Sequence, residues 1–360
     1  VPVVVIDDAQ MLAADVQAFL GQLIASAREA ITLIIVSRGQ VGIPLARTRA
    51  LGFLVEVEAE DLRLTPSEAT QLITSIAGDA IPAAATQQAV VDMDGWAAGL
   101  VMAAECLRSL RNPDLGGTAL SGRLAAHVAS YFEEEVLALQ SQRIQSFLVE
   151  TAVLDELVAA ACVAVTQDDA AGDTLNDAYR SGLFVRVVDL EAGRYAFHGA
   201  FGKALRDHLV HRSPAKSAEL HRRASLFHSG AGQALLALEQ ANASGDAEFL
   251  ADQLEKLAND LIYGGYLFRI DEVASELPWS IISTRPMLLL ALAWRRIRRL
   301  SYAAAERLIS AAEAIAQGRP EDHQLSCLVR HRKIMLAAAR DQMSIVEGDA
   351  EQLLLDLGDS

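Results

Sequence analysis

Several residue types and patterns are scarce in this sequence of 360 residues, and each shortage argues against a class of protein. The three cysteines, Cys106, Cys162 and Cys327, are far apart and lack metal-ligand spacing, which fits packed side chains in a reducing compartment. No apolar run reaches the roughly 18 residues of a membrane span. No basic segment followed by an apolar one stands at the N-terminus. The sequence therefore predicts a cytoplasmic protein without a membrane partner.

Basic and aromatic residues are also few. Lysine and arginine number 31 against 47 acidic residues, and the net charge of −16 argues against a surface that grips nucleic acid broadly. Aromatic residues make up only 5%, whereas alanine and leucine abound, which predicts a mainly helical chain. The hydrophobic share of 52% is ample for packed cores, and the length suits two or three domains.

Residues 1–60 alternate between apolar runs and a helical pattern. The runs at 3–6, 31–38 and 53–59 predict strands, and apolar residues at helical spacing from Leu12 to Ile24 predict a helix. Continuous apolar strands joined by a helix favour a parallel sheet covered on both faces. The first 60 residues are therefore predicted to belong to an α/β domain.

Residues 61–112 and 113–214 are predicted to form two further domains. Thr65, Pro66 and Glu68 have the pattern of a capping box, so a helix is expected to begin there. Helices continue to about residue 110, and RNPDLGG (111–117) is predicted to be a linker. In the stretch 182–198, two apolar strands flank a turn, and helices precede this hairpin, which is typical of a winged helix.

Residues 215–360 are predicted to be helical repeats. Segments rich in alanine and leucine are separated by the short breaks ASGD, YGGY, STRP and QGRP. Small residues at packing positions let helix pairs stack as a TPR-like α-solenoid. The predicted fold class is therefore mainly α, with an N-terminal α/β part, a helical domain, a winged helix and this solenoid.

Two aspartates, Asp7 and Asp8, directly follow the first apolar run. An aspartate at the carboxyl end of a parallel strand lies at the edge where open α/β folds bind ligands. In phosphate-loop ATPases such an aspartate holds Mg²⁺, and a neighbouring carboxylate orients the attacking water. A bound cation would relieve the repulsion between the pair. The alternative is a strand-to-helix turn in which an aspartate caps the next helix.

The second apolar run ends in Ser37 and Arg38. An arginine at the carboxyl edge of a neighbouring strand can reach a γ-phosphate and report its presence. The alternative is a surface arginine paired with a carboxylate, and the residue taken alone favours this alternative.

The order of several motifs resembles a known family. The motifs are VVVIDDAQ, LIIVSR, PLARTRALG (44–52), LRLTPSEATQLI (62–73) and GWAAGL (95–100). Their order is similar to that of signal-transduction ATPases with numerous domains (STAND), and within them to large LuxR-type transcriptional regulators related to the maltose-regulon activator. Stretches at 131–157, 183–201, 220–246 and 275–309 resemble that family's winged helix and helical repeats. The resemblance implies part of a P-loop NTPase sheet, with ATP or ADP and Mg²⁺ as cofactors.

The resemblance also implies roles for matching positions. Asp7 matches the carboxylate associated with Mg²⁺, and Asp8 matches its catalytic or water-orienting partner. Arg38 resembles the sensor arginine near the γ-phosphate. His198 lies where related switch ATPases place a histidine against the β-phosphate, to which an imidazole can donate a hydrogen bond. Packing of this histidine at a strand end is the alternative.

The motif GWAAGL departs from the family pattern. Relatives often have a proline two positions after the glycine, where it packs on the adenine, but this sequence has Ala97 there. Trp96 then has two interpretations. It either leans toward the base as a nucleotide-binding residue or packs in the core.

The phosphate loop itself is missing. No G-x-x-x-x-G-K-[ST] pattern occurs, and the one Gly-Lys pair, Gly202-Lys203, is followed by alanine in a predicted helix. In the family this loop precedes the Asp-Asp strand, and a DNA-binding helix-turn-helix follows the repeats. The sequence is therefore expected to be an internal piece of a longer regulator, a slow regulatory ATPase that contacts DNA only through a missing C-terminal domain. This piece alone is expected to be inactive.

Two hypotheses follow from this comparison. In the first, ADP joins the sheet domain to the winged helix through His198, and a small-molecule or protein inducer on the repeats favours an ATP-bound form that self-associates. In the second, the repeats are a protein-protein interaction scaffold without nucleotide chemistry.

A metal-dependent hydrolase built on Asp7 and Asp8 is disfavoured, because the sequence offers no further ligands or nucleophile. The basic cluster 295–299 is predicted to pair with local acids or another domain rather than with DNA.

Overall fold

A computed structural model describes residues 1–26, 30–39, 41–78, 81–109, 126–343, 346 and 350. The chain forms two compact units, Val1–Pro214 and Ala215–Ser360. The expected linker at 111–117 lies outside the described residues. Among the helices that are described, none has the length and apolar character needed to cross a membrane.

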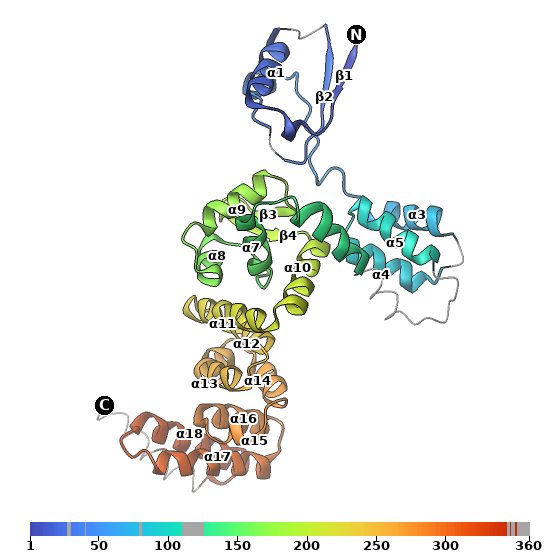
Figure 1. Ribbon diagram of the computed structural model, residues 1–360. Helices are drawn as coiled ribbons and strands as arrows, with labels where there is room; N and C mark the ends of the chain where they lie inside the picture. Colours follow the sequence, from blue (N-terminus) through green and yellow to red (C-terminus); the bar gives the residue numbers. More distant parts are fainter. Residues whose placement is uncertain are drawn as a thin grey trace. The chain divides into compact units, whose positions relative to one another are not determined.

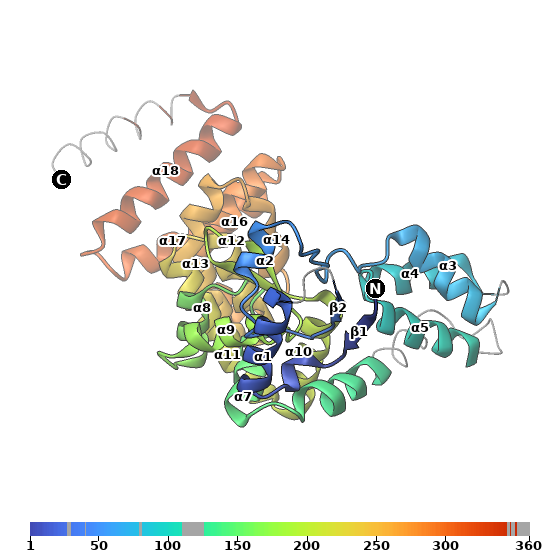
Figure 2. The same ribbon diagram turned by 90° about the horizontal axis from the view of Figure 1, so that it is seen from above.

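The first unit begins with a two-stranded parallel sheet. Strand β1 (Val3–Ile6) pairs with β2 (Thr32–Ile35), and the two lie side by side in both views (Figure 1 and Figure 2). The short 3-10 helix η1 (Ala9–Met11) and helix α1 (Ala14–Ser26) connect them. The two strands and the helix between them are confirmed.

Two expectations for this region are wrong. Residues 53–58 form no strand, and Val55 is 88% exposed. A strand is stabilised by a hydrogen-bonded neighbour, and in the described part of the chain β1 and β2 pair only with each other. The sheet is also not covered on both faces, because Val3, Val4 and Val5 are all exposed.

A helical segment follows the short helix α2 (Ala46–Ala50). It consists of α3 (Pro66–Ala77), α4 (Ala83–Met93) and α5 (Ala97–Ser109), which pack against one another. The predicted capping box at the start of α3 is confirmed. The Thr65 hydroxyl accepts a hydrogen bond from the Glu68 N–H at 3.3 Å, and the Glu68 carboxylate accepts one from the Thr65 N–H at 2.9 Å.

The described residues of the first unit after 126 form a winged helix. Its elements are the π-helical segment η2 (Phe132–Leu137), α7 (Gln142–Thr151), α8 (Ala159–Thr166), α9 (Ala171–Arg180), β3 (Val185–Asp189), β4 (Arg194–Phe197) and α10 (Gly199–Arg212). Strands β3 and β4 are antiparallel, so the predicted hairpin is confirmed. Gly202 and Lys203 lie inside α10, as expected of a pair that is no phosphate loop.

The regular elements of the second unit are all helices among the residues that the structure describes. Its helices are α11 (Pro214–Gly230), α12 (Ala234–Ala243), α13 (Ala247–Tyr263), α14 (Leu267–Ala274), α15 (Trp279–Ile282), α16 (Pro286–Arg298), α17 (Tyr302–Gln317) and α18 (His323–Ala339). The four predicted breaks all fall between helices. One continuous core runs from Ala237 to Leu336. The fold class is therefore confirmed as mainly α with small sheets, a winged helix and a helical solenoid.

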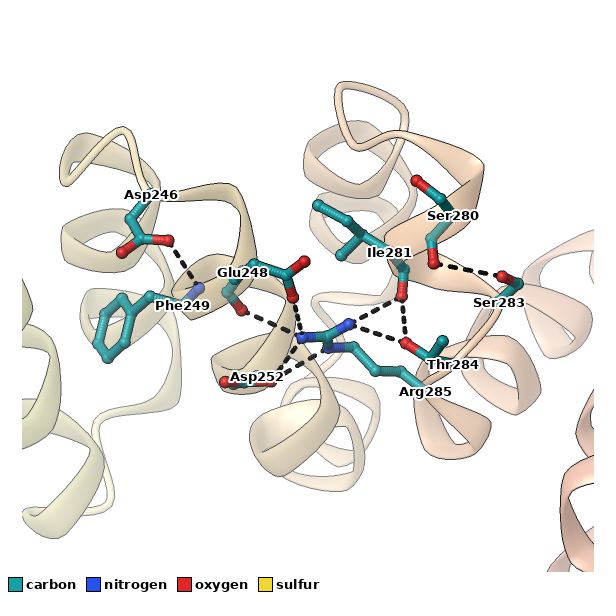
Figure 3. Close-up of polar contacts among 9 residues, drawn as sticks. All are labelled: Asp246, Glu248, Phe249, Asp252, Ser280, Ile281, Ser283, Thr284 and Arg285. Carbon is teal, nitrogen blue, oxygen red and sulfur yellow. Dashed lines mark hydrogen bonds and ion pairs between the residues drawn. The ribbon is translucent and has the colours of Figure 1, made fainter. Parts of the chain in front are cut away.

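An arginine joins neighbouring helices of this solenoid. Arg285 precedes α16, and its side chain is only 13% exposed. Its guanidinium donates to Glu248 at 2.6 Å and Asp252 at 2.7 Å on α13, and to the Ile281 carbonyl of α15 at 2.8 Å (Figure 3). The Glu248 and Asp252 side chains are 67% and 66% exposed, so solvent weakens each ion pair, and it is the several simultaneous bonds of one guanidinium that join the helices.

We expect Arg285→Ala to lower the protection of α13 and α16 amides from hydrogen exchange by about tenfold, which corresponds to about 1.4 kcal/mol. The variant leaves two carboxylates and a carbonyl without their shared donor. Hydrogen–deuterium exchange measured by mass spectrometry checks this. Arg319→Ala, at an exposed position after α17, is the matched control, and an equal effect of both variants would contradict the role of Arg285.

Candidate functional site

Polar side chains gather where β1 and β2 end. Asp7 and Asp8 follow β1, and Ser37 and Arg38 follow β2. Because the strands are parallel and in register, with Ile6 opposite Ile35, these residues meet at one edge of the sheet. With Gln10 of η1, they form what we call the strand-tip cluster.

Gln10 connects the two strand ends. Its side-chain nitrogen donates to the Asp8 carboxylate at 2.9 Å, and its side-chain oxygen accepts from the Ser37 hydroxyl at 3.0 Å and the Arg38 N–H at 3.1 Å. The sequence interpretation gave this residue no role, although it belongs to the motif VVVIDDAQ. The signal in the sequence was an amide side chain two positions after a pair of carboxylates at the end of a strand.

The two aspartates differ in backbone conformation and contacts. Asp8 has a left-handed backbone (φ 51°), which non-glycine residues seldom adopt. Its carboxylate makes no cap to η1, which removes support for the capping alternative, and lies 3.8 Å from the Arg38 guanidinium. Asp7 accepts a hydrogen bond from the Asp8 N–H at 2.8 Å. Arg38 thus pairs with a carboxylate, as its surface alternative predicts.

The donor set at this edge fits a hard cation with a phosphate. Mg²⁺ is usually held by one or two carboxylates together with waters and substrate phosphates, and Asp7 and Asp8 supply such carboxylates. The described residues contain no group of three or more His, Cys, Asp or Glu side chains arranged to hold a metal alone. Any Mg²⁺ here would therefore need phosphate oxygens or water to complete its coordination.

A second group of functional candidates surrounds Trp96, at the start of α5. The indole stacks on Phe132 with ring centroids 5.1 Å apart and meets Phe184 edge-on at 5.8 Å. The His198 ring lies 6.5 Å from the indole and 6.4 Å from Phe184. Phe132, Phe184 and His198 all belong to the winged helix, so Trp96 attaches the helical segment to it. We call these four residues the Trp96–His198 cluster.

One strained backbone lies in this cluster. Phe184 has φ 54°, and positive φ is an outlier for a bulky residue, whereas Asp94, with φ 46°, is the left-handed C-cap of α4. The Phe184 carbonyl accepts a hydrogen bond from the His198 N–H at 2.7 Å, and the Asp94 carbonyl accepts one from Arg63 at 2.8 Å. Such conformations persist where surrounding contacts determine them, and they concentrate at functional sites.

His198 combines burial with an unused nitrogen. Its Nδ1 is buried and has no hydrogen-bond partner among the described residues. Burial lowers the pKa of the imidazole, and the positive charges of Arg63 and Arg186 add to this. The charge of Asp94 and a hydrogen bond from the ring to the Asp94 backbone oppose it. The ring is therefore neutral at pH 7 and retains one nitrogen for a further hydrogen bond.

The turn before Phe184 also touches the loop after β2. Gly182 has φ 67°, and a Cβ on it would lie 1.5 Å from the Arg38 carbonyl oxygen. A residue with a side chain cannot occupy that position without moving the loop. The structure therefore brings Asp7, Asp8 and Arg38 together at one edge and Trp96 and His198 together in one cluster. The segment 182–184 connects Arg38 to that cluster, and the functional roles of all five residues stay predictions.

The basic cluster pairs with a local acid, as predicted. Asp271 lies 2.7 Å from the Arg296 guanidinium and 3.6 Å from those of Arg295 and Arg299. Arg298 of the same cluster lies over the Trp294 ring, with its guanidinium carbon 5.9 Å from the ring centroid.

Comparison with known proteins identifies one domain. Residues 133–217 match the MalT winged helix domain family. The match covers part of the chain, so it identifies this domain and not the whole protein.

A solved structure is similar over more of the chain. It is a Signal Transduction ATPase with Numerous Domains (STAND) protein with a tetratricopeptide repeat sensor from Pyrococcus horikoshii, with a TM-score of 0.40 and 11% identity over 99% of this chain. The chain spans 56% of that protein's length. A likeness this low carries no argument about function.

We expect the winged helix to lose stability as the pH falls below about 6.5, the ordinary pKa of histidine. The folded state holds the pKa of His198 below its unfolded value, so the unfolded state takes up the proton more readily and gains in acid. His198→Gln removes this part of the pH dependence. Urea unfolding at pH 7.5, 6.5 and 5.5, followed by hydrogen exchange of α10 peptides, measures it.

The control for this measurement is His211→Gln. His211 is exposed on the same helix and bonds to the Asp207 carbonyl one turn earlier. If it changed the pH dependence as much as His198→Gln, the assignment of that dependence to His198 would be wrong.

Proposed function

We propose that this chain is the central nucleotide-switch and sensor portion of an ATP-dependent LuxR-type transcriptional regulator of the STAND class. The observation that carries the proposal is the buried, unpartnered Nδ1 of His198 in a winged helix of the MalT type, beside Trp96 of the preceding helical segment. A nitrogen placed there is suited to a ligand that both segments contact.

The strand-tip cluster gives the proposal its chemistry. Bound ATP or ADP with Mg²⁺ would supply the phosphates and the anhydride bond whose cleavage resets the switch. Asp7 would hold the cation, and Asp8 would orient the attacking water. Arg38 would leave its present ion pair with Asp8 and pair with the terminal phosphate instead. Gln10 positions Asp8 and Arg38 through the bonds described above. The phosphate loop would come from chain outside this sequence.

His198 would act as a latch between the winged helix and the nucleotide. Its Nδ1 would donate to a phosphate oxygen as the Nδ1–H tautomer, in which the ring gives up its present hydrogen bond to the Asp94 backbone. Trp96 would support the latch by fixing the ring's position, and its packing against Phe132 and Phe184 favours this over direct contact with the base.

The wider switch extends to partners. We infer that a small-molecule or protein inducer on α11–α18 favours the open form through differential affinity for the two states. That form would self-associate and reach DNA through a C-terminal domain outside this sequence. The acidic character of the chain supports a winged helix that serves as an internal contact rather than a DNA reader.

A second function, a protein-protein interaction scaffold, has one observation in its favour. Arg38 pairs with Asp8 at an exposed edge, as an ordinary surface arginine does. A scaffold of this kind would need no nucleotide, and the next experiment separates the two.

In the protein translated from the complete natural gene, we expect His198→Ala to speed the dissociation of a fluorescent ADP analogue about tenfold, because one hydrogen bond to a charged group is lost. Basal transcriptional activation should rise. Stopped-flow release and a reporter assay measure the two effects. His211→Ala should change neither, and unchanged release from both variants would favour the scaffold.

A further inference from the structure

The second unit contains a pocket that the proposed nucleotide chemistry does not use. It lies among α14, α15, α16 and α17 and has a volume of about 560 Å³. Its apolar walls are formed by Leu277, Ile282, Leu292, Leu308 and Trp279. The Trp279 side chain is 56% exposed, so its ring is available to a ligand. This volume lies within the range of sites for small molecules.

The polar wall of the pocket carries a net positive charge. Asp271 and Arg296 line it, and the Asp271 carboxylate is already shared among Arg296, Arg295 and Arg299. Of these arginines only Arg296 lines the pocket, and with Arg307 the wall holds two guanidinium groups against the one carboxylate of Asp271. This is the opposite sign to that of the chain as a whole, whose net charge is −16.

Arg307 adds a cation that no carboxylate neutralises. It lines the pocket from α17, and among the described residues it forms no ion pair. Its neighbour Glu306 is paired with Arg340 at 2.7 Å, so the adjacent carboxylate is engaged elsewhere. An unpaired guanidinium beside an exposed indole suits a ligand that has both an anionic group and an apolar body.

We propose that this pocket binds a small organic acid. The apolar body of the acid, an aromatic ring or a short aliphatic chain, packs on Trp279 and the leucines. Its carboxylate pairs with Arg307 and Arg296. Charge complementarity selects an anion over a neutral or cationic compound, because the wall holds more guanidinium groups than carboxylates.

This site also gives the proposed inducer a chemical class, and that part of the inference rests on the proposed function. Occupancy would join α14 and α15 to α17 through one ligand. A ligand that binds one arrangement of these helices better than another shifts the equilibrium between them. The binding itself depends on no nucleotide.

The experiment compares two probes of one shape. 2-Naphthoate carries a carboxylate, and 2-naphthalenemethanol is its uncharged counterpart. Isothermal titration of the 360-residue chain without nucleotide measures both. We expect 2-naphthoate to bind at one site and at least tenfold more tightly than the alcohol, because the alcohol lacks the charge-assisted bonds.

Three variants locate the site. Arg307→Gln should weaken 2-naphthoate about tenfold and leave the alcohol unchanged. Ala304→Leu, which adds bulk to the half-buried wall of the pocket, should weaken both probes. Arg319→Gln, an exposed arginine outside the pocket, should change neither.

The outcomes separate this inference from the proposed function. Equal affinity for the two probes, or an unchanged affinity in Arg307→Gln, would overturn the organic-acid site. Binding at this pocket together with no effect of His198→Ala on ADP release would support the site and reject the switch. An effect of His198→Ala on ADP release, together with no binding of 2-naphthoate, would support the switch and reject the organic-acid site.

Discussion

A buried imidazole nitrogen without a partner is the constraint on which the first unit depends. Leaving such a group unpaired costs on the order of 1–3 kcal/mol, and a fold keeps it where another gain offsets the loss. His198 carries this cost where a MalT-type winged helix meets the helical segment at Trp96. Phe184, which lies beside it, has a positive φ that a bulky residue rarely adopts. Strain and an unmet hydrogen bond thus coincide at one place.

The strand-tip cluster depends on a simpler constraint. Two parallel strands in register deliver their last residues to the same edge, so carboxylates from one and an arginine from the other meet there. Gln10 fixes their spacing by bonding to both. The contact of Gly182 with the Arg38 carbonyl makes this edge sensitive to the turn that leads to Phe184. The strand-tip cluster and the Trp96–His198 cluster are therefore linked by this backbone contact between Gly182 and Arg38 rather than by contacts between their side chains.

The solenoid contains two arginine sites that differ in how their charge is balanced. Arg285 is matched by two carboxylates and stabilises the packing of α13. Asp271 is instead shared among several arginines, and Arg307 has no acid of its own in the described part of the chain. An excess of positive charge beside an apolar wall does little for stability, because unpaired like charges repel. It does suit recognition of an anion, which is why the two arginine sites differ in role.

The sequence by itself determined the elements whose signals are local. The capping box at Thr65, the hairpin before His198 and the breaks of the solenoid depend on neighbouring residues, so their patterns predicted them. It also determined that Asp7, Asp8 and Arg38 share an edge, since parallel strands leave no other arrangement. Only the tertiary structure decided the rest. Residues 53–58 form no strand because a strand depends on a neighbour, and Gln10, Phe184 and Arg307 owe their places to turns and packing between distant segments. Those contacts leave no regular pattern in the sequence, because they join residues that are far apart along the chain and meet only once the chain has folded.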